Sequence, residues 1–168
     1  MTDQSRFNAL NEKNAWDELL RCCGASKWAA KMLVARPFPD SDALFSAAET
    51  AFAVLNREDW LEAFAHHPQI GDLESLREKF ASTRDWAGNE QAGTHVASEQ
   101  ILRDLAEGNR LYQAKFGFIF IICATGKSAE AMLAALRERL DNDAETELRN
   151  AAEQQKQITR LRLGKLGL

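Results

Sequence analysis

Apolar residues recur at helical spacing along almost the whole chain, and this pattern limits the possible folds more than any other feature. Ala15, Trp16, Leu19 and Leu20 share one face when their segment is drawn as a helix. Comparable stripes cover residues 26–36, 41–55, 60–64, 73–80, 101–116, 128–140 and 148–161. Because each stripe needs a partner to bury it, the sequence predicts an all-α, single-domain helical bundle over residues 1–168.

Capping residues predict where several of these helices begin and end. Gly24 follows the first stripe and is expected to cap its C-terminus, and Ser26 is expected to cap the next helix. Asn142, with Glu145 three residues later, resembles a capping box at the start of the last helix.

The run Phe116–Ala124 departs from this pattern, because it is continuously apolar and rich in aromatic and β-branched residues. Such a run is typical of a buried strand, yet no other segment looks like a strand partner. It either forms one extended inner segment, with backbone N–H groups open to a ligand, or it enters a buried helix. The architecture we expect is a helical bundle with one extended inner segment.

Two imidazoles, a proline and a glycine crowd into the short stretch His66–Asp72. Pro68 disfavours helical geometry at the residue before it, so His67 is expected in an extended turn just after a helix. That turn lets His67 reach a ligand, and its titration near neutrality suits proton transfer. Only one of the adjacent residues His66 and His67 is expected to point inward.

Three further polar residues are candidates for chemistry. Glu90 and Gln91 stand together between two glycines, and Arg162 lies near the end of the last helix. A glutamate near a histidine fixes the tautomer of the imidazole or holds it protonated. Arg162 either pairs with an anionic group through two hydrogen bonds or is an ordinary surface charge.

Several kinds of site lack their signature in this sequence. A His-Glu-x-x-His helix and a Cys-x-x-Cys pair are both missing, so His66, His67, Asp72 and His95 do not predict a metal site. There is no Gly-x-Ser-x-Gly elbow and no glycine-rich phosphate loop. Neither a serine nucleophile nor a nucleotide cofactor is therefore expected.

Composition restricts the partners and the compartment. The net charge of −4 gives no reason to expect nucleic acid or an anionic membrane surface. No apolar run reaches the roughly 20 residues that cross a bilayer, so no membrane is expected. The polar start lacks a secretory signal, and Cys22, Cys23 and Cys123 do not make a disulfide framework. A cytoplasmic location is the simplest expectation.

Taken in order, several motifs of the chain resemble those of one family. They are Cys23–Trp28, Arg36–Phe38, His67–Asp72, Trp86–Gly93, Lys115–Ala124 and Ile158–Leu163. The family is that of the OHCU decarboxylases, and the resemblance covers nearly the whole chain. It implies an all-α fold, no cofactor, no metal and a homodimer. It also implies conversion of OHCU (2-oxo-4-hydroxy-4-carboxy-5-ureidoimidazoline), the hydrolysis product of 5-hydroxyisourate, to (S)-allantoin and CO₂ in urate breakdown.

The same resemblance implies a set of site residues. His67 takes the place of the family's catalytic histidine, and Glu90 is implied to orient it or to bind the ureido group. The implied substrate-binding residues are Pro68, Ala87, Gly88, Asn89, Glu90, Gln91, Phe118, Ile119, Phe120, Ile121, Ile122 and Arg162. From Phe118 to Ile122 the implied contacts are those of the backbone. Ala87 stands where many members have serine, so one hydroxyl contact is missing.

The residues alone also allow two other classes of protein. A helical interaction module without catalysis would explain the amphipathic helices, but it leaves His67, Glu90 and Phe118–Ile122 unconnected. A metal-dependent hydrolase needs ligands that the sequence does not display. Decarboxylation of OHCU needs neither metal nor pyridoxal, because a C=N bond beside the reacting carbon accepts the electron pair.

Overall fold

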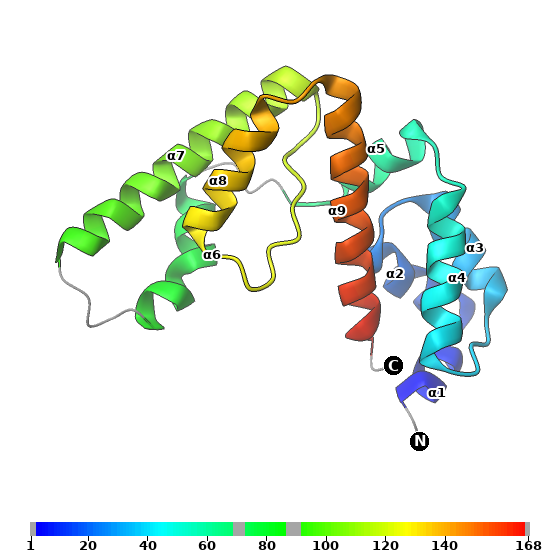
Figure 1. Cartoon of the computed structure of the whole chain (residues 1–168). Coiled ribbons are helices and arrows are strands. Elements are labelled where there is room, and N and C mark those ends of the chain that lie inside the picture. Colours follow the sequence, from blue (N-terminus) through cyan, green and yellow to red (C-terminus); the bar gives the residue numbers. More distant parts are fainter. Residues whose placement is uncertain (1–2, 69–72, 87–91, 167–168) are drawn as a thin grey trace. The chain divides into compact units, whose positions relative to one another are not determined.

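The computed structural model describes residues 3–68, 73–86 and 92–166, and the side chains of 6–68, 73–78, 80 and 99–166. Throughout this part of the chain the regular secondary structure is helical, which confirms the all-α fold. The helices are α1 (Asp3–Asn8), α2 (Glu12–Cys22), α3 (Ser26–Ala35), α4 (Ser41–Ala53), α5 (Arg57–Ala65), α6 (Leu73–Trp86), α7 (Ala92–Phe116), α8 (Ala129–Leu140) and α9 (Ala144–Gly164) (Figure 1). None of the described helices is long and apolar enough to cross a membrane.

The chain divides into two compact units. The first unit comprises Met1–His67 and Leu148–Leu168, and the second comprises Pro68–Glu147. Helix α9 therefore contributes its first turn to the second unit and the rest of its length to the first. The single domain expected from the sequence stays a prediction.

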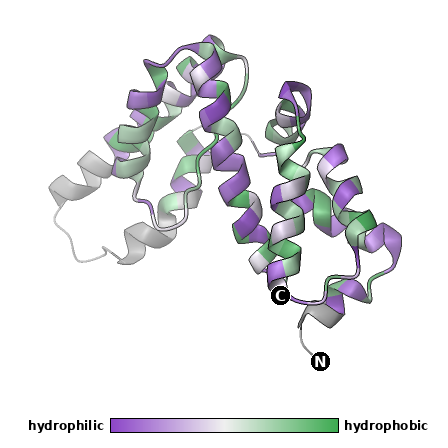
Figure 2. Cartoon of the chain, turned by 45° about the vertical axis from the view of Figure 1, so that its right-hand side comes forward, coloured by the Kyte–Doolittle hydropathy of each residue, from purple (hydrophilic) through white to green (hydrophobic). Residues whose placement is uncertain are grey.

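In the first unit, helix α3 packs against α2, α4 and α5. Its Trp28 is fully buried, and the indole Nε1–H donates to the carbonyl oxygen of Ala48 in α4 at 3.2 Å. This bond satisfies the one polar atom of a large buried ring. Figure 2 shows both hydrophilic and hydrophobic residues around the helices, which is the pattern of amphipathic helices that bury one side.

Two predicted helix starts are wrong by one residue. Ala25 is the N-cap of α3, and Ser26 is its first residue. The Ser26 N–H and hydroxyl both bind the carboxylate of Glu62 in α5, so a neighbouring helix supplies the acceptor that a cap would provide. At α9, Asp143 accepts from the Thr146 N–H at 2.8 Å, whereas the Asn142 side chain donates to Glu147.

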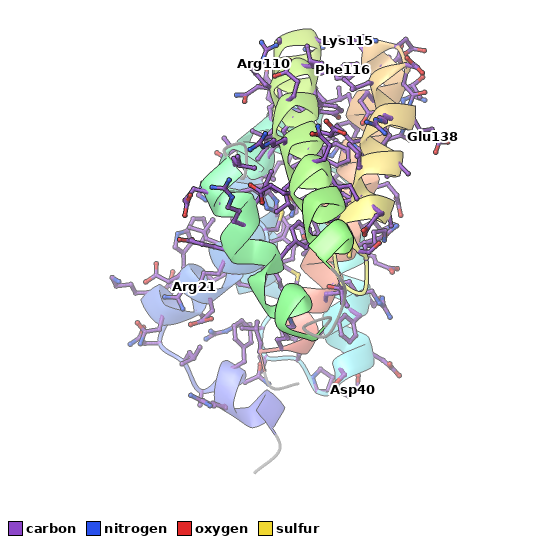
Figure 3. All side chains as sticks on the ribbon, turned by 90° about the vertical axis from the view of Figure 1, so that its left-hand side faces the viewer. Arg21, Asp40, Arg110, Lys115, Phe116 and Glu138 are labelled. Atoms are coloured by element: carbon purple, nitrogen blue, oxygen red, sulfur yellow. The ribbon has the colours of Figure 1, made fainter. Side chains whose placement is uncertain are left out.

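In the second unit, α7 and α8 lie side by side (Figure 1). Gly108 of α7 permits this close approach, because a Cβ there would lie 2.5 Å from a methyl carbon of Leu136 in α8. Figure 3 shows Glu138 pointing away from α7 on the outer side of α8. The buried cluster between the helices consists of Leu76, Phe80, Leu102, Leu105, Tyr112, Met132, Leu133 and Leu136.

Residues 118–124 form the extended inner segment, which settles the alternative that the sequence left open in favour of a non-helical run. Gly117 ends α7 with a φ of 82°, and its N–H donates to the Gln113 carbonyl. This left-handed conformation favours glycine. Every second residue then packs against the buried cluster, and these residues are Phe118, Phe120, Ile122 and Ala124. A repeat of two residues is the signature of an extended backbone.

A buried ion pair lies beside the extended segment. Glu147 is fully buried and accepts hydrogen bonds from Arg139 Nε at 2.5 Å and from the Tyr112 hydroxyl at 2.6 Å. Arg139 also donates through Nη1 to the Ile121 carbonyl at 2.6 Å, and its guanidinium lies over the Phe120 ring. Two charges taken from water are tolerated when their hydrogen bonds are made in this way.

Candidate active site

A cavity of about 320 Å³ in the first unit contains two of the residues predicted for the site. His67 reaches it from the turn that follows α5, and Arg162 reaches it from the last turn of α9. The remaining lining residues are Leu20, Arg21, Gly24, Ala63 and His66. Helix α5 ends at Ala65, so His67 lies outside the helix, as the following proline predicts.

Gly24 has a different role from the predicted helix cap. Helix α2 ends with Cys23 in an extended conformation, and Gly24 is not among the described residues with a positive φ. A Cβ on Gly24 would lie 2.3 Å from Cγ of His66. The glycine is therefore needed to make room for the histidine pair. Both His66 and His67 line the cavity, but His66 is exposed whereas His67 is half-buried, and the expectation that only one of them points inward stays a prediction.

The His67 ring is held by a residue that the sequence did not single out. His67 Nε2 lies 2.5 Å from Oε1 of Gln155 in α9. Gln155 is 1% exposed, and its Nε2–H donates to the Thr159 hydroxyl oxygen at 3.1 Å. The Thr159 hydroxyl in turn donates to the Gln155 backbone carbonyl at 2.8 Å. The imidazole is thus fixed by a chain of buried hydrogen bonds.

The surroundings of His67 favour its neutral form. Burial lowers the pKa of His67 below the usual value for histidine, and the nearby charges of Arg162 and His66 act in the same direction. The hydrogen bond to Gln155 opposes this shift without reversing it. A neutral imidazole at neutral pH can accept a proton, which suits the role of a general base.

Arg162 is anchored by a backbone carbonyl group of α2. One guanidinium nitrogen, Nη1, donates to the carbonyl oxygen of Arg21 at 3.0 Å. The Arg21 side chain takes no part in this contact, since Figure 3 shows it pointing away from α2. None of the described residues accepts a hydrogen bond from the other donors of Arg162, and Arg162 lines the cavity. An anion in the cavity would therefore meet a positioned positive charge.

Cysteine chemistry is not favoured near this cavity. Burial raises the pKa of the Cys22 thiol to about 12 and also raises the pKa of Cys23. A thiolate is the nucleophilic form of cysteine, so both residues are inert thiols at neutral pH. Both side chains are buried in the core of the first unit.

Ala87, Gly88, Asn89, Glu90 and Gln91 are outside the described residues, and Pro68 is exposed directly after His67. Residues 118–122 belong to the second unit. None of the described residues accepts a hydrogen bond from the N–H groups of Ile119, Phe120, Ile121 or Ile122. This is the property that binding through backbone groups requires.

In the part of the chain that the structure describes, the protein is all-helical and holds a neutral histidine and an arginine in one cavity. The OHCU decarboxylase family model matches residues 8–164. The chain belongs to the OHCU decarboxylase family, which confirms the resemblance seen in the sequence motifs.

Relatives of the chain agree with this assignment. It is 42% identical over 150 residues to the uric acid degradation bifunctional protein TTL of Arabidopsis thaliana, covering 89% of this chain and 46% of the relative. It is 28% identical over 159 residues to the 2-oxo-4-hydroxy-4-carboxy-5-ureidoimidazoline decarboxylase of Haloferax volcanii, covering 94% of this chain and 92% of the relative. The chain thus spans less than half of the first relative and nearly all of the second.

Solved structures resemble the chain as well. A crystal structure of OHCU decarboxylase in the presence of (S)-allantoin is 41% identical, with a TM-score of 0.69, covering 89% of this chain and 96% of that one. A crystal structure of (S)-allantoin synthase has a TM-score of 0.65 at 18% identity, covering 97% of this chain and 53% of that one. At that identity the second likeness concerns the fold alone.

Proposed function

We propose that this chain catalyses the cofactor-independent decarboxylation of OHCU to (S)-allantoin and CO₂. The observation that carries the proposal is the cavity shared by a neutral His67 and a positive Arg162 in a member of this family. The substrate is a carboxylate anion whose reaction needs one proton to move, and these two residues answer both requirements.

The chemistry balances without an added electron acceptor. Cleavage of the bond to the carboxylate releases CO₂, and its electron pair forms a C=C bond with the neighbouring ring carbon. The former C=N bond gives its pair to the ring nitrogen, which takes a proton from the medium. The hydroxyl then loses its proton and becomes the ring carbonyl, while the carbon that bears the ureido group gains a proton. That carbon is the stereocentre of allantoin.

In this proposal His67 transfers the proton of the substrate hydroxyl. Because its imidazole is neutral, it accepts the proton first and can return it to one face of the neighbouring carbon. General acid–base catalysis of this kind contributes about 10²–10⁴ in rate. Arg162 balances the negative charge of the substrate. Glu90 and Gln91 bind the ureido group, and the missing hydroxyl at Ala87 removes one contact.

Backbone donors complete the proposed substrate contacts. The N–H groups of Ile119 to Ile122 lack acceptors among the described residues, so they are available to oxygen or nitrogen atoms of the substrate. Donors placed where negative charge develops are commonly worth about 3 kcal/mol each. Pro68 and the backbone of Phe118 are also proposed to contact the substrate, as the family resemblance implies.

The proposal extends to the assembly and the compartment of the protein. A homodimer follows from the family resemblance, and sedimentation equilibrium of the purified chain tests it. A cytoplasmic location is supported by Cys22, Cys23 and Cys123, which are buried and form no disulfide with one another.

Release of CO₂ from freshly generated OHCU tests the proposed activity. We expect the protein to release CO₂ well above the spontaneous rate, with no loss after exhaustive dialysis against EDTA. A helical interaction module would leave the spontaneous rate unchanged. Activity that EDTA removes and zinc restores would replace the cofactor-free proposal with a metal-dependent one.

A further inference from the structure

We propose that Gln155 is a positioning residue that holds His67 in its Nε2–H tautomer and leaves Nδ1 as the proton-accepting atom. The inference rests on the proposed function, since it names the atom of His67 that takes the hydroxyl proton. Nothing in the sequence motifs points to Gln155, which comes 88 positions after His67.

The orientation of the Gln155 amide follows from Thr159. The Thr159 hydroxyl has a single hydrogen, and it donates that hydrogen to the Gln155 backbone carbonyl at 2.8 Å. Toward the Gln155 side chain the hydroxyl oxygen can therefore only accept. The group that it meets at 3.1 Å must be the NH₂ end of the amide. This places the carbonyl end, Oε1, against His67.

The tautomer of His67 follows from the orientation of the amide. A carbonyl oxygen has no hydrogen to give, so a 2.5 Å contact with His67 Nε2 requires the hydrogen to be on that nitrogen. A neutral imidazole carries one N–H, so Nδ1 has a free lone pair. None of the described residues forms a hydrogen bond with Nδ1. The atom that remains for the substrate is therefore Nδ1.

Burial makes this arrangement rigid. Gln155 is 1% exposed and Thr159 is 3% exposed, so water cannot replace either partner. The charged and titratable groups around His67 are Arg162 on α9, Arg21 on α2 and His66 beside it, and Cys23 contacts Thr159. None of these described groups is a carboxylate, and Glu62 on α5 binds Ser26 rather than His67, so no described carboxylate is bonded to the ring. An amide in this position fixes a neutral ring, whereas a carboxylate would stabilise the charged ring.

The tautomer can be measured on the whole protein without substrate. Nitrogen-15 NMR of the His67 ring distinguishes a protonated Nε2 from a protonated Nδ1 by their chemical shifts and couplings. We expect the proton on Nε2 at neutral pH. A proton on Nδ1 would overturn the inference. This result does not depend on turnover, so it stands apart from the test of the decarboxylase activity.

Substitutions connect the tautomer to the reaction. Gln155→Leu should lower kcat at least about tenfold with little change in KM, and should give a mixture of tautomers. Gln155→Glu should hold His67 protonated, so the acid limb of the pH–rate profile should move to higher pH. The matched control is Gln157→Glu, an exposed position on the same helix, where neither the profile nor the tautomer should change. A Gln155→Leu protein with wild-type kcat and an unchanged tautomer would contradict the inference, and the wild-type spectrum decides it if that variant does not fold.

Discussion

Arg139 donates a 2.6 Å hydrogen bond from Nη1 to the carbonyl oxygen of Ile121, and this bond ties the extended segment to a buried carboxylate. The peptide bond that follows Ile121 is trans, because the described cis bond is Arg36–Pro37. In a planar trans peptide the N–H points opposite to the C=O. The Ile122 N–H therefore faces away from Arg139, and none of the described residues accepts a hydrogen bond from it.

Replacing Arg139 should loosen the extended segment and destabilise the protein. Its side chain is 11% exposed and that of its partner Glu147 is 0% exposed, so Arg139→Met leaves a buried charge without its main partner. We expect a loss of about 3–5 kcal/mol in the free energy of unfolding. Hydrogen exchange at Gly117 and Lys127, whose N–H groups are hydrogen-bonded at the two ends of the segment, should also accelerate, and urea titration with exchange measurements reports both effects.

Two further variants control for the loss of an arginine as such. Arg137 lies on the same helix, is 64% exposed and pairs with Asp104 at 3.3 Å. Arg137→Met should cost less than about 1 kcal/mol. Adding Glu147→Gln to Arg139→Met removes the buried charge and should recover part of the stability. Equal stability losses for Arg137→Met and Arg139→Met would show that the buried pair does not anchor the segment.

Activity should fall on the acid side of the pH profile only below the usual histidine range. The pKa of His67 is lowered by burial, so the neutral, active form persists below about pH 6.5, the ordinary value. The free energy of unfolding should change with pH in the same direction as the activity. The unfolded chain binds the proton at higher pH than the folded protein. The contribution of His67 is therefore complete above about pH 6.5 and is lost as the pH falls through the folded pKa.

The charge of Arg162 helps to lower the pKa of His67, so replacing Arg162 should shift the acid limb of the pH–rate profile. In Arg162→Met the acid limb of kcat/KM should shift to higher pH, and KM should rise because the anionic substrate loses a partner. Arg160→Met is the control, since Arg160 lies on the same helix but pairs with Glu49 at the surface. A profile that is identical in wild type and Arg162→Met would exclude this electrostatic coupling.

Gly24→Ala should damage the site through a neighbour. The new methyl would lie 2.3 Å from Cγ of His66, so the turn that carries the histidine pair must move. Overpacking of this kind costs about 1–3 kcal/mol, and kcat should fall with the displacement of His67. Gly164→Ala is the matched control, because a Cβ there meets nothing within 4 Å. Thermal unfolding and steady-state rates of both variants report the difference.

Glu90→Gln should cost far more activity than Ala87→Ser. The first change removes a carboxylate that is proposed to bind the ureido group, whereas the second only adds a hydroxyl group. The ratio of kcat/KM to wild type is the measurement for both. A Glu90→Gln protein with wild-type kcat/KM would remove this residue from the mechanism.

The helices were predictable because their signal is local. Apolar residues at helical spacing and the residues that flank them lie within one segment, and tertiary packing does not change them. The extended segment was partly predictable, since aromatic and β-branched residues favour it. The segment is extended rather than helical because Gly117 ends α7 and because Arg139 binds the Ile121 carbonyl. The Arg139 bond joins two elements that are separate in the sequence, so no local pattern predicts it.

The details of the site depended on contacts that no local pattern reveals. Gly24 has the sequence context of a helix cap, but its real constraint is the His66 ring. In the sequence Gln155 is one of several amides in a polar helix, and only its contact with His67 in the folded protein distinguishes it. Its spacing offered a signal, because residues 155, 159 and 162 share one face of a helix. His67 was found from its position before Pro68 and Arg162 from its position near the end of the last helix, and the family resemblance then implied their roles.

The optical activity of the allantoin formed from freshly generated OHCU tests the central claim most directly. Circular dichroism would follow three parallel reactions, with wild type, with His67→Gln and without protein. We predict that wild type rapidly yields (S)-allantoin, whereas folded His67→Gln forms product about 10²–10⁴ times more slowly, as the racemate of the spontaneous reaction. Rapid formation of (S)-allantoin by folded His67→Gln, at the wild-type rate, would contradict the account.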